Sequence, residues 1–79
     1  MIPLHAFVEG DVIGLVVLAD PQRTVAELVA QIERAASVRV RPTGRARLVF
    51  EGRALLGDAI VGDLGLSPLD RVDLHREVS

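Results

Sequence analysis

The spacing of apolar residues changes at Thr24 from a period of two to a period between three and four, and this change constrains the fold most. Residues 3–9 and 12–18 precede it. The first run alternates apolar with less buried residue types, the second is rich in β-branched residues, and a tight Gly10-Asp11 turn separates them. Such runs are typical of two β-strands that form a hairpin.

Residues 24–36 have the apolar spacing of an amphipathic helix of about three turns. The apolar stripe consists of Val25, Leu28, Val29 and Ile32. A capping box marks the start of the helix, because the Thr24 hydroxyl can accept from the amide of Glu27 while the Glu27 carboxylate accepts from the amide of Thr24.

The chain after the helix contains further strand signals. Residues 47–51 predict a third strand with Leu48 and Phe50 on one face, and residues 54–56 predict a short fourth segment.

The last third of the chain combines an irregular stretch with one more strand. Residues 57–66 are expected to be irregular or to form a single turn, held on the core by Ile60, Leu64 and Leu66. In the final strand Val72 and Leu74 are predicted to face inward, and Asp73 and His75 outward.

Two strands, one helix and two or three further strands make up the α+β arrangement called the β-grasp. In this fold a mixed four- or five-stranded sheet packs one face on a single main helix, with the first and last strands parallel in the middle of the sheet. A chain of 79 residues makes one domain, so we expect residues 1–79 to form a single domain of this type.

The composition excludes several classes of protein. Without cysteine the chain has no disulfide framework and no thiolate metal site, and without lysine it has no side-chain amine for a Schiff base or an isopeptide bond. Its longest apolar run, residues 12–19, is too short to span a bilayer, and its N-terminus lacks the basic region of a signal peptide. A soluble protein of the cytoplasm is therefore expected.

The arginines are unevenly distributed. Six of the nine lie between positions 34 and 53, where only Glu51 opposes them, so this window carries a net charge of +5 in a chain whose net charge is −2. Nucleic-acid binding is disfavoured, because stacking aromatic residues are missing and the rest of the chain is acidic. Docking onto an acidic protein surface suits arginine better, and Arg39 and Arg41 are candidate contacts of this kind.

Catalytic and metal-binding signals are weak. The few hydroxyl side chains occur in no nucleophile-like context, and no glycine-rich phosphate loop is present. The only two histidines, His5 and His75, share the outer face of the predicted sheet with Asp73, but their register offsets them along the sheet. We therefore expect no catalytic, cofactor-binding or metal-binding residue in this chain.

An apolar set of residues on the outer face of the sheet is the most informative functional feature. Val12, Val16 and Leu18 point away from the helix side in the second strand, and Phe7 joins them from the first. One helix cannot cover both faces of a sheet, and a contiguous apolar cluster more often marks a protein interface than a solvent-exposed surface. These residues are predicted to contact a partner protein.

The sequence resembles two related groups of proteins. Residues 47–53 and 72–75 look like the second half of ubiquitin-like domains. Residues 2–11, followed by residues 15–17, resemble the N-terminal hairpin of the small gamma subunit (system protein B) of toluene 4-monooxygenase-type multicomponent hydroxylases, and residues 65–68 are similar to that family too.

The second resemblance implies a specific role. It implies a non-catalytic accessory subunit of a bacterial soluble di-iron monooxygenase, bound to the large alpha subunit in a hydroxylase dimer of alpha, beta and gamma chains. The di-iron centre would lie in the alpha chain, and the complex would take electrons from NADH to oxidise aromatic or alkene hydrocarbons. By position, Val49 and Arg53 match the ubiquitin recognition patch and are added as candidate contacts, whereas His75 interrupts that patch.

Two alternatives follow from the ubiquitin-like pattern. Conjugation or sulfur carriage needs a C-terminal Gly-Gly tail, and the sequence given ends in Arg76-Glu77-Val78-Ser79, so carrier activity is not expected. The other alternative is a free-standing bacterial ubiquitin-like adaptor that binds proteins without conjugation activity.

Overall fold

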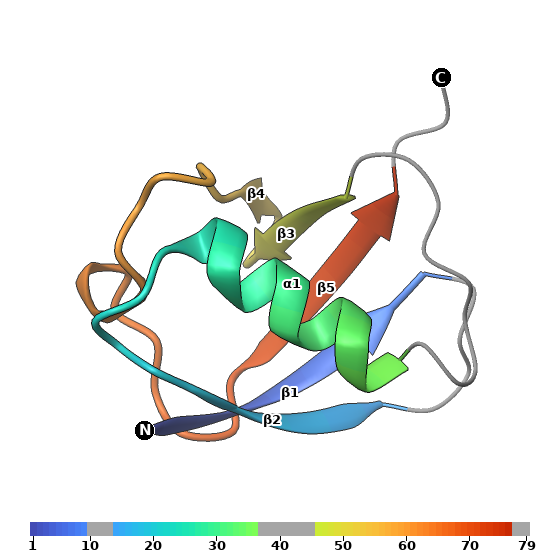
Figure 1. Ribbon diagram of the computed structural model, residues 1–79, viewed down its shortest axis with the longest axis horizontal. Coiled ribbons are helices and arrows are strands. Elements are labelled where there is room, and N and C mark those ends of the chain that lie inside the picture. Colours follow the sequence, from blue (N-terminus) through green and yellow to red (C-terminus); the bar gives the residue numbers. More distant parts are fainter. Residues whose placement is uncertain (10–13, 37–45, 77–79) are drawn as a thin grey trace.

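The fold is a five-stranded mixed sheet with one helix packed across one of its faces (Figure 1). The computed structural model describes residues 1–9, 14–36 and 46–76. Three of the candidate contacts, Val12, Arg39 and Arg41, lie outside the described residues.

The order of strands in the sheet is β2-β1-β5-β3-β4. The elements are β1 (Ile2–Val8), β2 (Leu15–Ala19), α1 (Val25–Ala36), β3 (Ala46–Phe50), β4 (Arg53–Ala54), the 3-10 turn η1 (Val61–Asp63) and β5 (Arg71–Arg76). β1 and β5 are parallel neighbours at the centre, and the other pairs are antiparallel. This topology confirms the predicted ubiquitin-like β-grasp fold.

The core lies between α1 and the inner face of the sheet. Alternate residues of the strands are buried, as the period of two predicts, and α1 buries one stripe against them. The buried apolar residues are Leu4, Ala6, Val8, Val17, Ala19, Val25, Leu28, Ile32, Ala36, Leu48, Phe50, Val61, Val72 and Leu74. No polar residue among the described ones is buried.

Two predictions for the second half of the chain are wrong in detail. The fourth strand is only two residues long, Arg53–Ala54, and Leu55 and Leu56 lie outside it. Ile60 is 38% exposed and the neighbouring Val61 is fully buried instead, whereas Leu64 and Leu66 do pack against the core. The reason is that Ile60 pairs with Thr24 in an isolated bridge, which turns the next residue inward as η1 begins.

Within the described residues, no helix combines the length and the apolar character that crossing a membrane requires.

The capping box at the start of α1 is formed as predicted. The amide of Glu27 donates to the Thr24 hydroxyl at 3.2 Å, and the amide of Thr24 donates to the Glu27 carboxylate at 3.2 Å. Hydrogen bonds from the Thr24 backbone and from the Arg23 guanidinium, together with the Thr24 hydroxyl, lower the pKa of Glu27 below its usual 4.5. The box therefore holds the Glu27 carboxylate in its charged form.

The lowered pKa of Glu27 predicts a pH-dependent contribution to stability. A carboxylate whose pKa is lower in the folded state stabilises the fold above its unfolded pKa, and this stabilisation is lost as the pH falls through its folded pKa. We expect the free-energy difference between the wild type and Glu27→Gln to be constant above about pH 5 and to shrink below it. Thermal unfolding followed by circular dichroism at a series of pH values measures this difference. A difference independent of pH would contradict the assignment.

Candidate partner interface

The face of the sheet that α1 leaves open carries exposed apolar side chains on β2. Val16 is 63% exposed and Leu18 is 53% exposed, whereas the alternate residues Val17 and Ala19 are buried. Strand alternation therefore places the first pair on the outer face, as the sequence predicts. Large apolar side chains exposed at adjacent positions on one face are the first component of a candidate interface.

Two further exposed apolar residues lie near the start of β1, Met1 on the same side as Leu18 and Leu69 across β1 from it. Leu18 is paired with Pro3 across β1 and β2, and the carbonyl of Pro3 accepts a hydrogen bond from the amide of Leu69. Met1 precedes β1 and lines a pocket together with Leu18. We call Met1, Val16, Leu18 and Leu69 the apolar patch; each of them is more than half exposed.

Leu69 has an unusual backbone conformation. Its φ angle is 64°, in the left-handed region that non-glycine residues adopt at a cost, and its side chain is 63% exposed. A turn that needed only this backbone shape would be satisfied by Gly or Asn. The leucine thus adds exposed apolar surface where the local backbone does not favour it.

Phe7 lies on the same face but is largely covered by its own chain. The guanidinium carbon of Arg71 lies 4.1 Å from the centroid of the Phe7 ring, and the His5 ring centroid lies 4.9 Å away. Asp73 fixes the arginine through an Nη2–Oδ1 contact of 3.0 Å. A Cβ at Gly14 would lie 2.9 Å from the Phe7 ring, so a larger residue there would require the ring to shift. Phe7 is therefore half-buried beneath a cation–π contact rather than freely exposed.

The other two described candidates, Val49 and Arg53, do not belong to the apolar patch. β3 lies on the far side of β5 from β1 and β2, and Val49 is half-buried there. In the β3–β4 ladder Val49 is opposite Ala54 and Arg53 is opposite the buried Phe50. Since neighbouring pairs of a ladder point to opposite faces, Arg53 and Val49 belong to different faces.

The outer face does not assemble the residues of a metal site in the part of the chain that the structure describes. No three His, Cys, Asp or Glu side chains come together among these residues. The register places His5 opposite Arg71 and Phe7 opposite Asp73, while His75 lies opposite Arg47 on β3. The carboxylate of Asp73 is engaged by Arg71.

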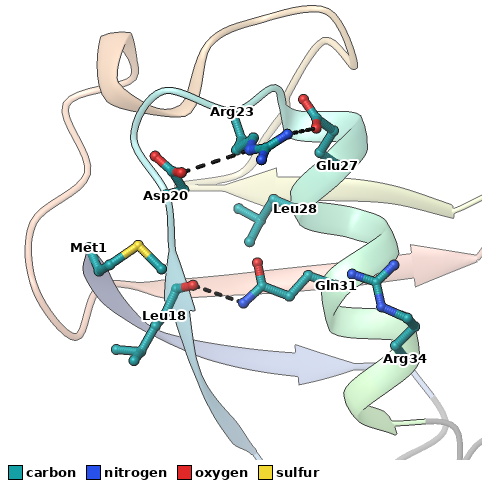
Figure 2. A pocket seen from close by; sticks show the side chains of 8 residues that line it. All are labelled: Met1, Leu18, Asp20, Arg23, Glu27, Leu28, Gln31 and Arg34. Atoms are coloured by element: carbon teal, nitrogen blue, oxygen red, sulfur yellow. Dashed lines mark hydrogen bonds and ion pairs between the residues drawn. The ribbon is translucent and has the colours of Figure 1, made fainter.

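A groove between β2 and α1 adjoins the apolar patch (Figure 2). At its upper end Arg23 bridges Asp20 and Glu27, with N–O distances of 3.8 and 2.9 Å. Further along, Gln31 reaches from α1 to the edge strand, and its side-chain amide donates to the carbonyl of Leu18 at 2.8 Å. The groove therefore has a polar helix side and an apolar strand side.

A comparison with known protein families shows which family this chain belongs to. The family described as toluene-4-monooxygenase system protein B (TmoB) matches residues 1–75. The chain belongs to the TmoB family.

Solved structures agree with this TmoB assignment at the level of the fold. A chain in the toluene 4-monooxygenase HD complex with the inhibitor 4-bromobenzoate is 22% identical, with a TM-score of 0.87 and coverage of 96% of this chain and 98% of that one. Ubiquitin from Caldiarchaeum subterraneum is 20% identical, with a TM-score of 0.79 and coverage of 99% and 95%.

A third structure, described as molecular mimicry of SUMO promoting DNA repair, is 24% identical with a TM-score of 0.78, covering 94% of this chain and 89% of that one. A comparison with curated protein sequences finds no match.

Sequence reasoning missed part of this TmoB chain's apolar patch. Met1 and Leu69 gave no periodic signal, because one precedes the first strand and the other sits in a turn. The contact of Gln31 with the edge of β2 was not predicted either. Its position three residues after Leu28, close to the buried stripe of the helix, was the available signal.

Proposed function

We propose that this chain is the non-catalytic gamma subunit of a bacterial multicomponent hydrocarbon monooxygenase, bound to the large alpha subunit of the hydroxylase. The observation that carries the proposal is the match to the TmoB family over residues 1–75. The apolar patch supports it independently, since an uncovered apolar strand edge in a small domain is an aggregation hazard unless a partner covers it.

The proposal assigns assembly rather than chemistry to this chain. The described residues gather no metal-ligand cluster, and the imidazole of His5 packs on the ring of Phe7. A carboxylate-bridged di-iron centre needs several inward-facing carboxylates and histidines, a set that these strands do not present. We therefore place the di-iron centre in the alpha subunit, and we place the assembled complex in the cytoplasm.

Co-expression with the alpha and beta subunits of a toluene 4-monooxygenase-type hydroxylase tests the proposed function. We expect this chain to elute with them in size-exclusion chromatography, and we expect iron in the complex but not in the isolated chain, as measured by elemental analysis. Because the interface is apolar, the association should persist in 1 M salt, where the Debye length falls to about 3 Å.

A free-standing ubiquitin-like adaptor would behave differently. It would elute alone at the volume of an 8.5 kDa protein in the presence of all hydroxylase subunits, and that result would refute the accessory-subunit role.

A further inference from the structure

The backbone of β2 has a free edge. β2 is the first strand in the sheet order, so it has a strand neighbour only on the β1 side. The hydrogen bonds between β1 and the segment around β5 show which β1 residues point away from β2. They therefore also show which amides and carbonyls of β2 point to its free edge. Two hydrogen bonds settle this, those from the His5 amide to the Asp70 carbonyl at 2.9 Å and from the Leu69 amide to the Pro3 carbonyl at 2.6 Å.

These two bonds show that Pro3 and His5 direct their main-chain groups toward β5 and away from β2. In an antiparallel pair, residues opposite each other either exchange both hydrogen bonds or both point away. Val16 is opposite His5 and Leu18 is opposite Pro3, so both β2 residues direct their amides and carbonyls to the free edge.

The Gln31 side chain provides an independent check. It donates to the Leu18 carbonyl from the helix side, which is possible only if that carbonyl points away from β1 (Figure 2). Gln31 thus satisfies one of the four edge groups. Among the described residues, none pairs with the amide or carbonyl of Val16 or with the amide of Leu18.

We propose that the free edge of β2 binds an extended segment of the alpha subunit as a sixth strand. This inference rests on the proposed function. The three open groups of Val16 and Leu18 match the hydrogen-bond spacing of an added strand, and their exposed side chains offer apolar contact to alternate residues on its outer face. On its other face the added strand would meet the polar helix side of the groove, so an amphipathic strand is favoured.

A second copy of this chain fits the edge less well. A standard interface buries about 800 Å² on each partner, roughly a sixth of the 5046 Å² of accessible surface of this chain. Self-pairing of the five-residue β2 brings only Val16 and Leu18 from each copy as exposed apolar contacts. A larger partner can both add a strand and cover the rest of the apolar patch.

A proline variant tests the backbone contribution. Val16→Pro removes an amide that points to the free edge, so the β1–β2 hydrogen bonds stay intact. We expect it to fold, as judged by circular dichroism, and to bind the co-expressed hydroxylase about 10- to 100-fold more weakly than wild type, because one partner carbonyl loses its donor. Val16→Thr changes the same side chain but keeps the amide, and we expect it to bind more tightly than Val16→Pro. Wild-type affinity of the proline variant would overturn the proposal.

Residue-resolved hydrogen exchange tests the same point without a substitution. In the isolated chain the amides of Val16 and Leu18 should exchange fast and the amide of Val17 slowly, and in the complex all three should be protected. Complex formation without new protection at Val16 and Leu18 would overturn the strand addition while leaving the proposed function intact.

Two other outcomes are informative. A wild-type chain that binds no hydroxylase subunit would overturn both proposals. Protection of Val16 and Leu18 in a homodimer of the isolated chain would overturn the choice of the alpha subunit as occupant.

Discussion

Leu74→Ala is expected to remove a large share of the free energy that keeps this protein folded. Leu74 is fully buried at the middle of the central strand β5, between Val8 on β1 and Leu48 on β3. Truncation of a buried leucine removes about 2–5 kcal/mol of unfolding free energy. A 79-residue domain has about 4–12 kcal/mol in total, at 0.05–0.15 kcal/mol per residue. The variant should therefore melt about 10–30 °C below the wild type.

The measurement is thermal unfolding by far-ultraviolet circular dichroism, since the chain has no tryptophan or tyrosine for fluorescence. His75→Ala is the matched control, because it changes the next residue of the same strand on the exposed side. A surface substitution of this kind should alter the free energy of unfolding by no more than about 0.5 kcal/mol. Equal melting temperatures for the two variants would show that the core is not centred on β5.

The sequence predicted those parts of the fold that depend on local chemistry. The helix from Val25 to Ala36 has both a repeating apolar stripe and a capping box within its own residues. The inward residues of β1 and β5 follow from alternation alone. By contrast, the burial of Val61 depends on the bridge between Thr24 and Ile60, a contact between distant segments that no local pattern encodes.

The candidate interface was predictable to a similar degree. Alternation along β2 identified Val16 and Leu18 as outward-facing, and the structure confirms their exposure. The partial covering of Phe7 was not predictable, because it requires Arg71 from the opposite end of the chain. Leu69 was not predicted as an exposed apolar residue, because its exposure depends on a left-handed backbone angle. Residues with this angle are ordinarily Gly or Asn.

A charge placed in the apolar patch should abolish assembly with the hydroxylase. We expect Leu18→Asp to weaken binding by at least about 100-fold, because a carboxylate buried in an apolar contact without a partner loses its hydration and gains no hydrogen bond. Leu18 is 53% exposed in the isolated chain, so the same change should leave its fold intact. Affinity is measured by titrating the purified variant into hydroxylase that lacks the gamma subunit.

Leu56→Asp is the control for this comparison. Leu56 is 73% exposed, undergoes the identical substitution and lines a different pocket, with Leu55 and Leu64, away from β2. If the patch is the interface, Leu56→Asp binds like the wild type and Leu18→Asp does not. If both variants bind normally, the partner covers another surface. If only Leu56→Asp fails, the interface lies at the β4 end of the sheet, because the substitution is the same and both side chains are more than half exposed.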